Sequence, residues 1–450
     1  MGAQSVSNVH FNGLRNRLDA REAVVGVIGL GYVGLPLAVA VARQGLKTIG
    51  FDIDPQKIEL LSAGTSYIQA VSQDELAQVI GAELFSYTTD FSRLSECDVI
   101  VICVPTPLSR YREPDLSYVE NTSREIAKHI TRGTLVSLES TTFPGTTREI
   151  VTPILETSGL VAGEDFFVAF SPEREDPGNT SFHTATIPKI VAGDGPLASV
   201  LAEQFYAIVV EKVVRVSTTQ TAEAVKITEN IFRAVNIALV NELKVIYDAM
   251  GIDVWEVIDG ASTKPFGYMP FYPGPGLGGH CIPIDPFYLT WKAREYDLST
   301  RFIELAGEIN VNMPHYVVGR TAEILDSVGG IGLRGARVLI VGIAYKKNVP
   351  DMRESPSMRI MDLLLSRGAE VDFHDPHVPS IPPMRAYAHL QGMESLQLGE
   401  AQQKKHDIVV IATDHDNVAY DALVALGVPI VDTRNAMARR GLPMDKVFKA

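Results

Sequence analysis

The segment Val24-Val-Gly-Val-Ile-Gly-Leu-Gly-Tyr-Val-Gly34 runs from a short apolar strand into a turn with glycine at positions 29, 31 and 34. Glycines at this spacing in a strand–turn–helix unit allow a tight turn, close approach of the backbone to a pyrophosphate, and close packing of helix on strand. The free N–H groups that open the helix would then bind the phosphates. The segment predicts a dinucleotide site that contains Gly29, Gly31, Tyr32, Val33 and Gly34.

A carboxylate follows the second predicted strand. Asp52 ends the apolar run Thr48–Asp52, 18 residues after Gly34. A carboxylate in this place accepts hydrogen bonds from a ribose diol and disfavours a 2′-phosphate, which favours NAD over NADP. Asp54 is the alternative, and Asp52 is preferred because it directly follows the strand. A Rossmann fold that has lost its cofactor is the other interpretation of this pattern.

Further apolar runs are separated by helix-length segments, as expected for a parallel sheet covered on both faces. In the first half of the chain these runs are Asp98–Val104, Thr134–Glu139 and Phe166–Phe170. After Gly335 the rhythm restarts with Val338–Gly342, a helix at Pro356–Arg367, Val371–His374, Ile408–Ala412 and Ile430–Asp432. The predicted fold class is α/β, with two doubly wound, Rossmann-like domains.

A long helical pattern joins the two α/β regions. Residues 219–250 contain no glycine or proline, and apolar residues return every three or four positions. A second helical pattern covers residues 300–328, where Pro314 predicts a kink or break. We therefore expect a disordered segment at 1–20, an NAD-binding domain at 21–215, a central helical domain with a dimer contact at 216–328, and a second, smaller doubly wound domain at 329–450.

Composition limits the possible classes of protein. The 450 residues carry a net charge of −14, which argues against a protein that coats nucleic acid or an anionic membrane. Three cysteines fit a reducing cytoplasm, and no spacing predicts a metal site, since His374 and His377 are better explained as a turn. The uncharged run Ala23–Ala42 is long enough for a membrane span, but its glycines fit the phosphate turn better.

The segment Pro273-Gly-Pro-Gly-Leu-Gly-Gly-His-Cys-Ile-Pro-Ile-Asp285 carries the most distinctive chemistry. Its glycines would let the backbone approach a ligand and present Cys281 from an unusual turn, with Asp285 four residues later. Cys97 and Cys103 lie in or beside an apolar strand, where cysteine is usually a small hydrophobe. From the residues alone, Cys281 as a nucleophile and Cys281 as a structural residue remain comparable alternatives. A pair with His280 is less favoured, because adjacent side chains usually point apart.

Two polar residues share one face of the long helix. Lys226 and Asn230 are four positions apart, and a lysine in an apolar helix is costly without a partner or a task. One interpretation is a structural ion pair, with Glu223 as the partner. The other is a pair of donors directed at a developing oxyanion.

Ordered motifs along nearly the whole chain resemble the UDP-glucose/GDP-mannose dehydrogenase family. The resemblance rests on these segments: Gly29–Gly34 with Asp52, Val104-Pro-Thr-Pro107, Ser140-Thr-Thr142, Ser171-Pro-Glu-Arg174, Glu223-Ala-Val-Lys226 with Asn230, Gly278-Gly-His-Cys281 with Asp285, Ala344-Tyr-Lys-Lys347 and Asp351-Met-Arg-Glu-Ser-Pro356. It implies an NAD-dependent, four-electron oxidation of the C6 alcohol of a UDP-sugar to a uronic acid. It also implies that the catalytic cysteine loop belongs to the central domain at 216–328 and that the domain at 329–450 binds the nucleotide sugar.

The resemblance also implies roles for individual residues. Cys281 would capture the aldehyde as a thiohemiacetal and later carry a thioester. Lys226 and Asn230 would stabilise oxyanions, Asp285 and Thr141 would assist water or proton movement, and Glu173 would be the general base unless it only caps a turn. Cofactor contacts extend to Lys57, Thr106 and Thr141. Substrate contacts extend to Arg174, Lys226, Asn230, Phe271, Tyr272, Gly276, Gly278, Lys346 and Arg353.

The segment Arg174-Glu-Asp-Pro-Gly178 departs from the glucose branch of the family, so a catalytic role for Glu175 stays open. Together with residues 264–276 and 284–288 it resembles the UDP-N-acetylglucosamine 6-dehydrogenase branch, which makes precursors of bacterial-type surface polysaccharides. UDP-glucose, UDP-N-acetylgalactosamine and UDP-N-acetylmannosamine remain alternative substrates. Arg353 is expected to reach the site of a neighbouring subunit, which implies at least a homodimer.

Two other functions are compatible with parts of the sequence. A two-electron dehydrogenase of the hydroxyacid type shares the glycine turn and a Lys–Asn helix, but has no need of Cys281 or of a second α/β domain. A non-catalytic sensor of nucleotide sugars would bind without turnover, and it leaves Cys281, Lys226 and Asp285 unexplained. We expect a cytoplasmic enzyme with NAD as its cofactor and no metal.

Overall fold

The structure is a computed structural model, and it describes residues 8–68, 70–109, 113–174, 185–279, 282–384, 386–401 and 403–450. The chain divides into two compact units. Unit 1 comprises Met1–Glu229 and Phe287–Leu298, and unit 2 comprises Asn230–Pro286 and Ser299–Ala450. This division is coarser than the three folded segments predicted from the sequence, whose boundaries stay predictions.

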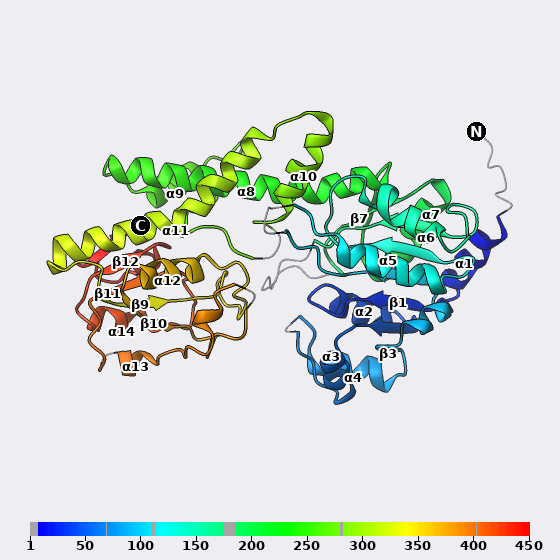
Figure 1. Ribbon diagram of the computed structural model, residues 1–450, viewed down its shortest axis with the longest axis horizontal. Coiled ribbons are helices and arrows are strands. Elements are labelled where there is room, and N and C mark those ends of the chain that lie inside the picture. Colours follow the sequence, from blue (N-terminus) through cyan, green and yellow to red (C-terminus); the bar gives the residue numbers. More distant parts are fainter. Residues whose placement is uncertain are drawn as a thin grey trace. The chain divides into compact units, whose positions relative to one another are not determined.

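The described part of unit 1 is built on an eight-stranded sheet, ordered β3-β2-β1-β4-β5-β6-β7-β8 (Figure 1). Its strands are β1 (Val25–Ile28), β2 (Thr48–Phe51), β3 (Phe85–Thr88), β4 (Val99–Ile102), β5 (Leu135–Leu138), β6 (Phe167–Phe170), β7 (Lys189–Gly193) and β8 (Val213–Arg215). All neighbours pair in parallel except β6 and β7. The first six strands follow the doubly wound order, which confirms the predicted fold class.

Helices cover both faces of this sheet. Successive strand residues point to opposite sides, so each face carries its own apolar side chains. Val25 and Val27 pack into one apolar core, whereas Ile28 packs into another with Ile100 and Ile102. The helices and turns of helix before the central segment are α1 (Val9–Asp19), α2 (Gly34–Arg43), α3 (Pro55–Ser62), α4 (Gln73–Gly81), η1 (Phe91–Glu96), α5 (Ser117–His129), η2 (Thr147–Val151), α6 (Thr152–Glu156) and α7 (Pro196–Val209).

Helix α1 lies within the segment that the sequence predicted to be disordered, so that prediction is wrong for residues 9–19. The side chain of Asn8 accepts a hydrogen bond from the N–H of Phe11 and caps the helix. Phe11, Leu14 and Leu18 are buried, and the Phe11 ring packs edge-on against Phe167 of β6. Tertiary burial of this one apolar face orders a helix whose other residues are mostly polar.

Unit 2 contains the second α/β region, with a five-stranded sheet in its described part. The order is β10-β9-β11-β12-β13, and every pair is parallel. The strands are β9 (Arg337–Val341), β10 (Glu370–His374), β11 (Ile408–Ile411), β12 (Ile430–Asp432) and β13 (Val447–Lys449). Accompanying helical elements are α12 (Pro356–Ser366), η4 (Ala388–Leu390), α13 (Leu398–Ala401), α14 (Tyr420–Ala425) and α15 (Ala436–Arg439). Separate apolar cores cover its two faces, as in unit 1.

Two of the central helices, α8 and α11, are long, as predicted. They are α8 (Thr219–Ala249), α9 (Val254–Ser262), α10 (Asp285–Ala293), η3 (Arg294–Tyr296) and α11 (Arg301–Gly329). Pro314 lies inside α11 and does not end it. An internal proline costs about 3 kcal/mol, and burial of Met313, Val317 and Val318 around it offsets that cost.

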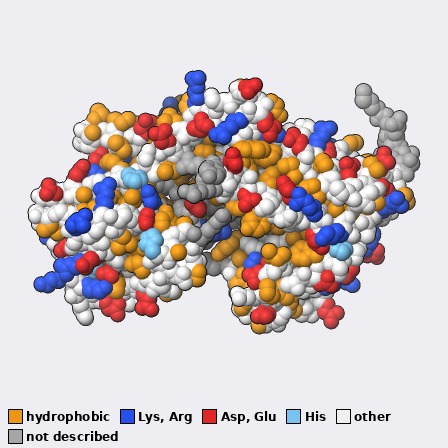
Figure 2. Space-filling model, viewed as in Figure 1, with side chains coloured by type: hydrophobic (Ala, Val, Ile, Leu, Met, Phe, Trp, Pro, Cys, Tyr) orange, Lys and Arg blue, Asp and Glu red, His pale blue; other side chains and the backbone are white. Residues whose placement is uncertain are grey.

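No helix in the described residues has both the length and the hydropathy required to cross a bilayer. The uncharged run Ala23–Ala42 forms strand β1 and most of the ten-residue helix α2. Basic and acidic side chains are interspersed on the face drawn in Figure 2.

Candidate active site

The glycine turn of unit 1 has the geometry that the sequence predicted. Gly29 has a φ of +92°, and a Cβ there would lie 2.7 Å from the carbonyl oxygen of Cys103. A Cβ on Gly34 would lie 1.9 Å from the carbonyl oxygen of Gly29. Both positions therefore require glycine for the turn and for packing of α2 against the sheet.

Gly31 differs from the other two glycines. A Cβ at this position would meet no atom within 4 Å, so protein packing does not explain the glycine. Gly31 precedes α2, whose N-cap residue is Val33, a residue without a side-chain acceptor for the helix N–H groups. Open space beside a ten-residue helix N-terminus fits the pyrophosphate of a dinucleotide.

Asp52 lies directly after β2 and is buried. Its Oδ2 accepts a hydrogen bond from the N–H of Leu30 at 2.8 Å and pairs with Nζ of Lys57 at 2.7 Å. Its Oδ1 accepts a bond from the N–H of Asp54 at 3.0 Å. Asp54 itself caps α3 by accepting a bond from Gln56. The two carboxylates therefore have different roles: Asp54 caps a helix, whereas Asp52, with Lys57, lies at the glycine turn.

The loops after β4 and β5 carry Thr106 and Thr141. The backbone carbonyl of Thr106 accepts a hydrogen bond from the hydroxyl of Tyr288 at 2.9 Å. The Ser140 hydroxyl donates to the carbonyl of Val104 at 2.7 Å, which ties the two loops together. In a doubly wound sheet ligands bind at the carboxyl ends of the strands, and both threonines lie there.

Glu223 of α8 holds the other end of the loop that carries Thr141. The buried carboxylate accepts bonds from the N–H of Gly145 at 2.5 Å, from the N–H of Thr147 at 2.8 Å and from the Thr147 hydroxyl at 2.7 Å. Burial raises the pKa of Glu223 to about 7, although these hydrogen bonds lower it. The carboxylate therefore serves this loop, which argues against the structural Glu223–Lys226 ion pair.

Lys226 lies one turn further along α8 and is also buried. Its Nζ donates to the backbone carbonyl of Glu173 at 2.5 Å. Arg174 forms a two-point contact with Glu229 of α8, with Nε–Oε2 at 3.3 Å and Nη2–Oε1 at 2.5 Å. Its third nitrogen donates to the carbonyl of Pro188. Two predicted site residues, Glu173 and Arg174, are thereby fixed to the helix that carries Lys226.

Unit 2 brings together Asn230 and Asp285. The side-chain amide of Asn230 donates to Oδ2 of Asp285 at 2.5 Å, and both residues are buried. Asp285 is the first residue of α10. Cys281, with His280, lies outside the described residues, as does Glu175. Their predicted roles therefore stay predictions.

The glycines before Cys281 are required by packing contacts that could not be predicted from the sequence. A Cβ on Gly278 would lie 2.6 Å from Cβ of Tyr345, and one on Gly276 would lie 3.1 Å from Cβ of Pro356. A Cβ on Gly274 would lie 2.4 Å from the guanidinium of Arg434. These glycines let the segment pack directly on the second α/β region, whereas the sequence indicated only approach to a ligand.

The two aromatic residues of this segment have different environments. Phe271 packs edge-on against Phe232 of α8, with ring centroids 5.7 Å apart. Tyr272 donates its hydroxyl to Asp259 at 2.6 Å, and the guanidinium of Arg439 lies over its ring at 4.4 Å. Both positions are compatible with the predicted substrate contacts, which remain predictions.

Basic residues gather at the carboxyl edge of the second sheet. Lys346 and Lys347 follow β9, and Lys347 pairs with Asp416 at 2.6 Å. Arg353 pairs with Asp351 at 2.6 Å, and its carbonyl accepts a bond from the N–H of Gly279. Within one chain the structure thus places Arg353 beside the segment that precedes Cys281.

Arg434 belongs to the same edge and was missed by the sequence analysis. It follows β12, and its Nε donates to the carbonyl of Ala412, which follows β11. Among the described residues no carboxylate lies within ion-pair distance of its guanidinium, and burial lowers its pKa. Asp414 and Asp432 act on it only at longer range. A cation without a carboxylate at ion-pair distance, at the carboxyl edge of a doubly wound sheet, suits a phosphate. In the sequence, its place directly after an apolar strand was the available signal.

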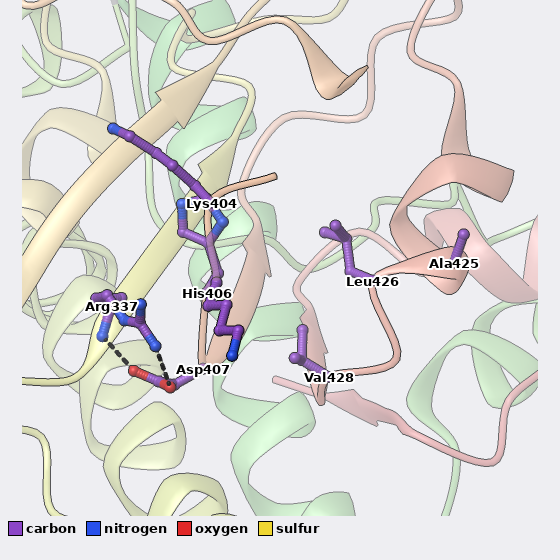
Figure 3. Close-up of a pocket in the computed structure, with 8 residues that line it drawn as sticks. Arg337, Lys404, His406, Asp407, Ala425, Leu426 and Val428 are labelled. Atoms are coloured by element: carbon purple, nitrogen blue, oxygen red, sulfur yellow. Dashed lines mark hydrogen bonds and ion pairs between the residues drawn. The ribbon is translucent and has the colours of Figure 1, made fainter. Parts of the chain in front are cut away.

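A hollow of about 340 Å³ lies at the opposite, amino edge of the same sheet (Figure 3). Its charged residues are largely paired with one another or with nearby acids, since Arg337 contacts Asp407 at 3.3 Å and Lys404 contacts Asp372 at 2.9 Å. Ligands of doubly wound sheets bind at the carboxyl edge, so this hollow is not the candidate active site. The described residues contain no cluster of metal-ligating side chains.

The other two cysteines have the environment expected of small hydrophobes. Cys97 is buried and Cys103 is half-buried. Burial raises the pKa of Cys97 to about 12 and that of Cys103 well above its ordinary value. A thiol with a raised pKa is a poor nucleophile at neutral pH. Cys281 is therefore the remaining candidate among the three cysteines.

A dinucleotide turn, a carboxylate after the next strand and donors on a central helix define a nicotinamide-dependent dehydrogenase as the class of protein. Comparison with known sequences gives the family. Residues 23–210 match the NAD binding domain of the UDP-glucose/GDP-mannose dehydrogenase family, residues 220–312 its central domain and residues 339–439 its UDP binding domain. The chain belongs to this family, and it is an NAD-dependent nucleotide-sugar dehydrogenase.

Individual relatives extend over nearly the whole chain. The UDP-N-acetyl-D-glucosamine 6-dehydrogenase of Pseudomonas aeruginosa is 36% identical over 88% of this chain and 91% of its own. The solved UDP-D-ManNAc dehydrogenase of Pyrococcus horikoshii has a TM-score of 0.83 at 34% identity, covering 92% and 96% of the two chains. The NDP-N-acetyl-D-galactosaminuronic acid dehydrogenase of Methanosarcina mazei Go1 has a TM-score of 0.80 at 30% identity, covering 99% and 98%.

Proposed function

We propose that the chain oxidises the C6 alcohol of UDP-N-acetylglucosamine to the uronic acid in two steps, with Cys281 as the covalent catalyst. NAD supplies the hydride acceptor for each oxidation. One alcohol, two NAD⁺ and one water give one carboxylate, two NADH and three protons. The observation that carries the chemistry is the Asn230–Asp285 contact, which sets a buried carboxylate four residues after Cys281.

The thiol of Cys281 adds to the aldehyde formed in the first oxidation, and its proton passes to the new oxyanion. The second oxidation converts this thiohemiacetal to a thioester, which water cleaves to the acid and the free thiol. Covalent capture prevents the aldehyde from escaping before its second oxidation. Lys226 and Asn230 stabilise the oxyanions, and Asp285 accepts a proton from the attacking water.

Glu173 is the proposed general base for the alcohol. Its backbone carbonyl is held by Lys226, and its Oε1 accepts a bond from its own neighbour, the N–H of Arg174, at 2.6 Å. Thr141 lies in the loop anchored by Glu223 and assists proton movement or cofactor contact. Gly29, Gly31, Tyr32, Val33, Gly34, Asp52, Lys57 and Thr106 make up the proposed cofactor site.

The nucleoside diphosphate is proposed to bind at the carboxyl edge of the second sheet, through Lys346 and Arg434. Arg174, Phe271, Tyr272, Gly276 and Gly278 are the further proposed substrate contacts. Two relatives, from Pseudomonas aeruginosa and Salmonella typhi, are UDP-N-acetyl-D-glucosamine 6-dehydrogenases, at 36% and 33% identity. Others are named for N-acetylmannosamine or N-acetylgalactosaminuronic acid, and they keep these sugars as alternatives.

The experiment that tests the substrate is NADH production from a panel of UDP-N-acetylglucosamine, UDP-N-acetylgalactosamine, UDP-N-acetylmannosamine and UDP-glucose. We expect the highest kcat/KM with UDP-N-acetylglucosamine. Turnover of UDP-glucose alone would contradict the proposed sugar. Binding without NADH would favour a nucleotide-sugar sensor. We propose further that the enzyme acts in the cytoplasm and that its product is a precursor of a bacterial-type surface polysaccharide.

We propose a homodimer that uses the exposed apolar face of α8. Phe232, Leu239 and Ile246 are spaced by seven residues and are 47%, 49% and 46% exposed. A sevenfold apolar stripe is typical of a helix that pairs with another helix. Sedimentation of Leu239→Asp should show monomers where the unchanged chain shows dimers. The proposed reach of Arg353 to a neighbouring site would depend on this pairing.

A further inference from the structure

In unit 1 a single buried ammonium group is shared by two carboxylates. Nζ of Lys189 lies 2.8 Å from Oε2 of Glu139 and 3.0 Å from Oε2 of Glu173. The side chains of Lys189 and Glu139 are 4% and 0% exposed. Lys189 begins β7, and the two glutamates follow the ends of β5 and β6. Because an isolated buried charge costs several kcal/mol, all three groups depend on one another.

Uncharged partners complete this buried cluster. The hydroxyl of Tyr206 on α7 donates to Oε1 of Glu139 at 2.7 Å, and Ser137 of β5 lies 2.8 Å from the same hydroxyl. The thiol of Cys103, after β4, is close enough to be influenced by both carboxylates. Burial raises the pKa of Tyr206 and of Cys103, so both are neutral at physiological pH.

The remaining charged neighbours act on the backbone of Glu173 or are already paired. Lys226 of α8 contacts the carbonyl oxygen of Glu173 and not its carboxylate. The guanidinium of Arg174 is bound to Glu229 of α8. Lys189 is therefore the cation that the described structure places on the Glu173 carboxylate.

Among the described residues of the cluster, negative charge exceeds positive charge. One ammonium faces two carboxylates, so each carboxylate is attracted by Lys189 and repelled by the other carboxylate. Burial raises the pKa of Glu139, which Lys189 and Tyr206 only partly oppose. Burial alone would lower the pKa of Lys189, but the two carboxylates raise it above its ordinary value. Lys189 stays charged, and the two carboxylates compete for it.

We infer that Lys189 and Glu139 are positioning residues of the reaction, which together set the charge and the direction of the Glu173 carboxylate. This inference rests on the proposed role of Glu173 as general base. Lys189 holds Oε2, and the N–H of Arg174 holds Oε1, so the carboxylate has a fixed orientation. The negative charge of Glu139 opposes the effect of Lys189 at Glu173, and so keeps Glu173 basic enough to accept a proton.

The inference predicts opposite effects for two substitutions in one cluster. Lys189→Met removes the cation and raises the pKa of Glu173, by about 1–3 units for the loss of a close opposite charge. Glu139→Gln removes the competitor and lowers the pKa of Glu173. Loss of packing alone cannot produce shifts of opposite sign.

The test is a ¹³C NMR titration of protein labelled at the glutamate carboxyl carbon, with Glu173→Gln used to assign the signal. The acid limb of kcat/KM for NADH production is measured on the same variants. We expect both quantities to move to higher pH in Lys189→Met and the carboxyl titration to move to lower pH in Glu139→Gln. Shifts of the same sign, or no shift, would overturn the inference.

Two further variants control for folding. The double variant Lys189→Met with Glu139→Gln leaves no unpaired carboxylate at position 139. Comparing it with Glu139→Gln alone measures the effect of Lys189, and the pKa of Glu173 should still be higher in the double variant. Lys292→Met is the matched control, because Lys292 also bridges two carboxylates, Glu149 and Glu295, and its substitution should leave the pKa of Glu173 unchanged.

If the Glu173 titration shifts but kcat/KM does not follow, the positioning role is wrong while the proposed oxidation still stands. If no nucleotide sugar yields NADH, the proposed function itself fails.

Discussion

Asn230 of α8 donates its side-chain amide to Oδ2 of Asp285, the first residue of α10, at 2.5 Å. The bond joins two residues that are 55 positions apart in sequence, and both are buried. It orients the Asp285 carboxylate, which we propose accepts a proton from the water that cleaves the thioester.

Asp285→Asn should slow this cleavage more than the first oxidation. A missing general base typically lowers a rate by about 10²–10⁴-fold. We expect a burst of NADH followed by a slow steady state, measured by stopped-flow absorbance. Loss of the burst and the steady state to the same extent would contradict a role in thioester cleavage. Asp326→Asn, which changes an exposed acid on α11 of unit 2, is the control for charge and folding.

Gly31→Ala and Gly34→Ala should have different effects. A Cβ on Gly34 would collide with the backbone of Gly29, so we expect a loss of about 1–3 kcal/mol in the free energy of unfolding. A Cβ on Gly31 meets no protein atom, so Gly31→Ala should fold normally. It should nevertheless weaken NAD binding by about tenfold or more, or 1.4 kcal/mol, because the methyl group occupies pyrophosphate space. Calorimetry measures both, and unchanged NAD affinity in Gly31→Ala would argue against this site.

Arg434→Met should weaken UDP binding and leave NAD binding unchanged, since Arg434 lies at the carboxyl edge of the second sheet. Loss of one charged hydrogen-bonding partner costs roughly 1.5–3 kcal/mol, or more than tenfold in affinity. Arg337→Met is the matched control, because Arg337 begins β9 at the opposite edge of that sheet. Equal loss of UDP affinity in both variants would contradict the placement of the diphosphate.

Glu223 should make the stability of the protein depend on pH. Its pKa is raised from 4.5 to about 7, so the folded state holds its proton more tightly than the unfolded state does. The contribution of Glu223 to stability is then fully present below about pH 4.5 and is lost as the pH rises to about 7. Relative to Glu223→Gln, the unchanged chain should lose on the order of 3 kcal/mol between these limits. Urea unfolding at pH 5 and pH 8 measures the difference, and a constant difference would contradict it.

Much of the fold could be predicted because its strands are short, continuously apolar and followed by glycine or an acidic residue. Strands β1, β2 and β9 end in this way, and the turn between Gly29 and Gly34 was recognised from its glycine spacing. Strand β3 contains Ser86 and Tyr87 and lies at the sheet edge, so its polar sequence gave no strand signal. Helix α1 was missed because only three residues of its apolar face are buried.

The site was predictable where a motif has a local cause, and not where it depends on distant contacts. Asp52 and Lys57 are five residues apart, and both were predicted cofactor contacts, Asp52 from its place after a strand and Lys57 from the family resemblance; the structure shows that they form an ion pair. Lys189 and Glu139 are separated by 50 residues, and only the folded sheet shows that they share one ion pair. Glycine is required at position 278 because a Cβ there would collide with Tyr345, which lies 67 positions away in the sequence.

The central claim is that Cys281 retains the aldehyde until it is oxidised a second time. The most direct measurement is the number of NADH molecules formed for each nucleotide sugar consumed. The account predicts two NADH and one uronic acid, with no aldehyde released. One NADH for each sugar, with an aldehyde or ketone as the product, would contradict it.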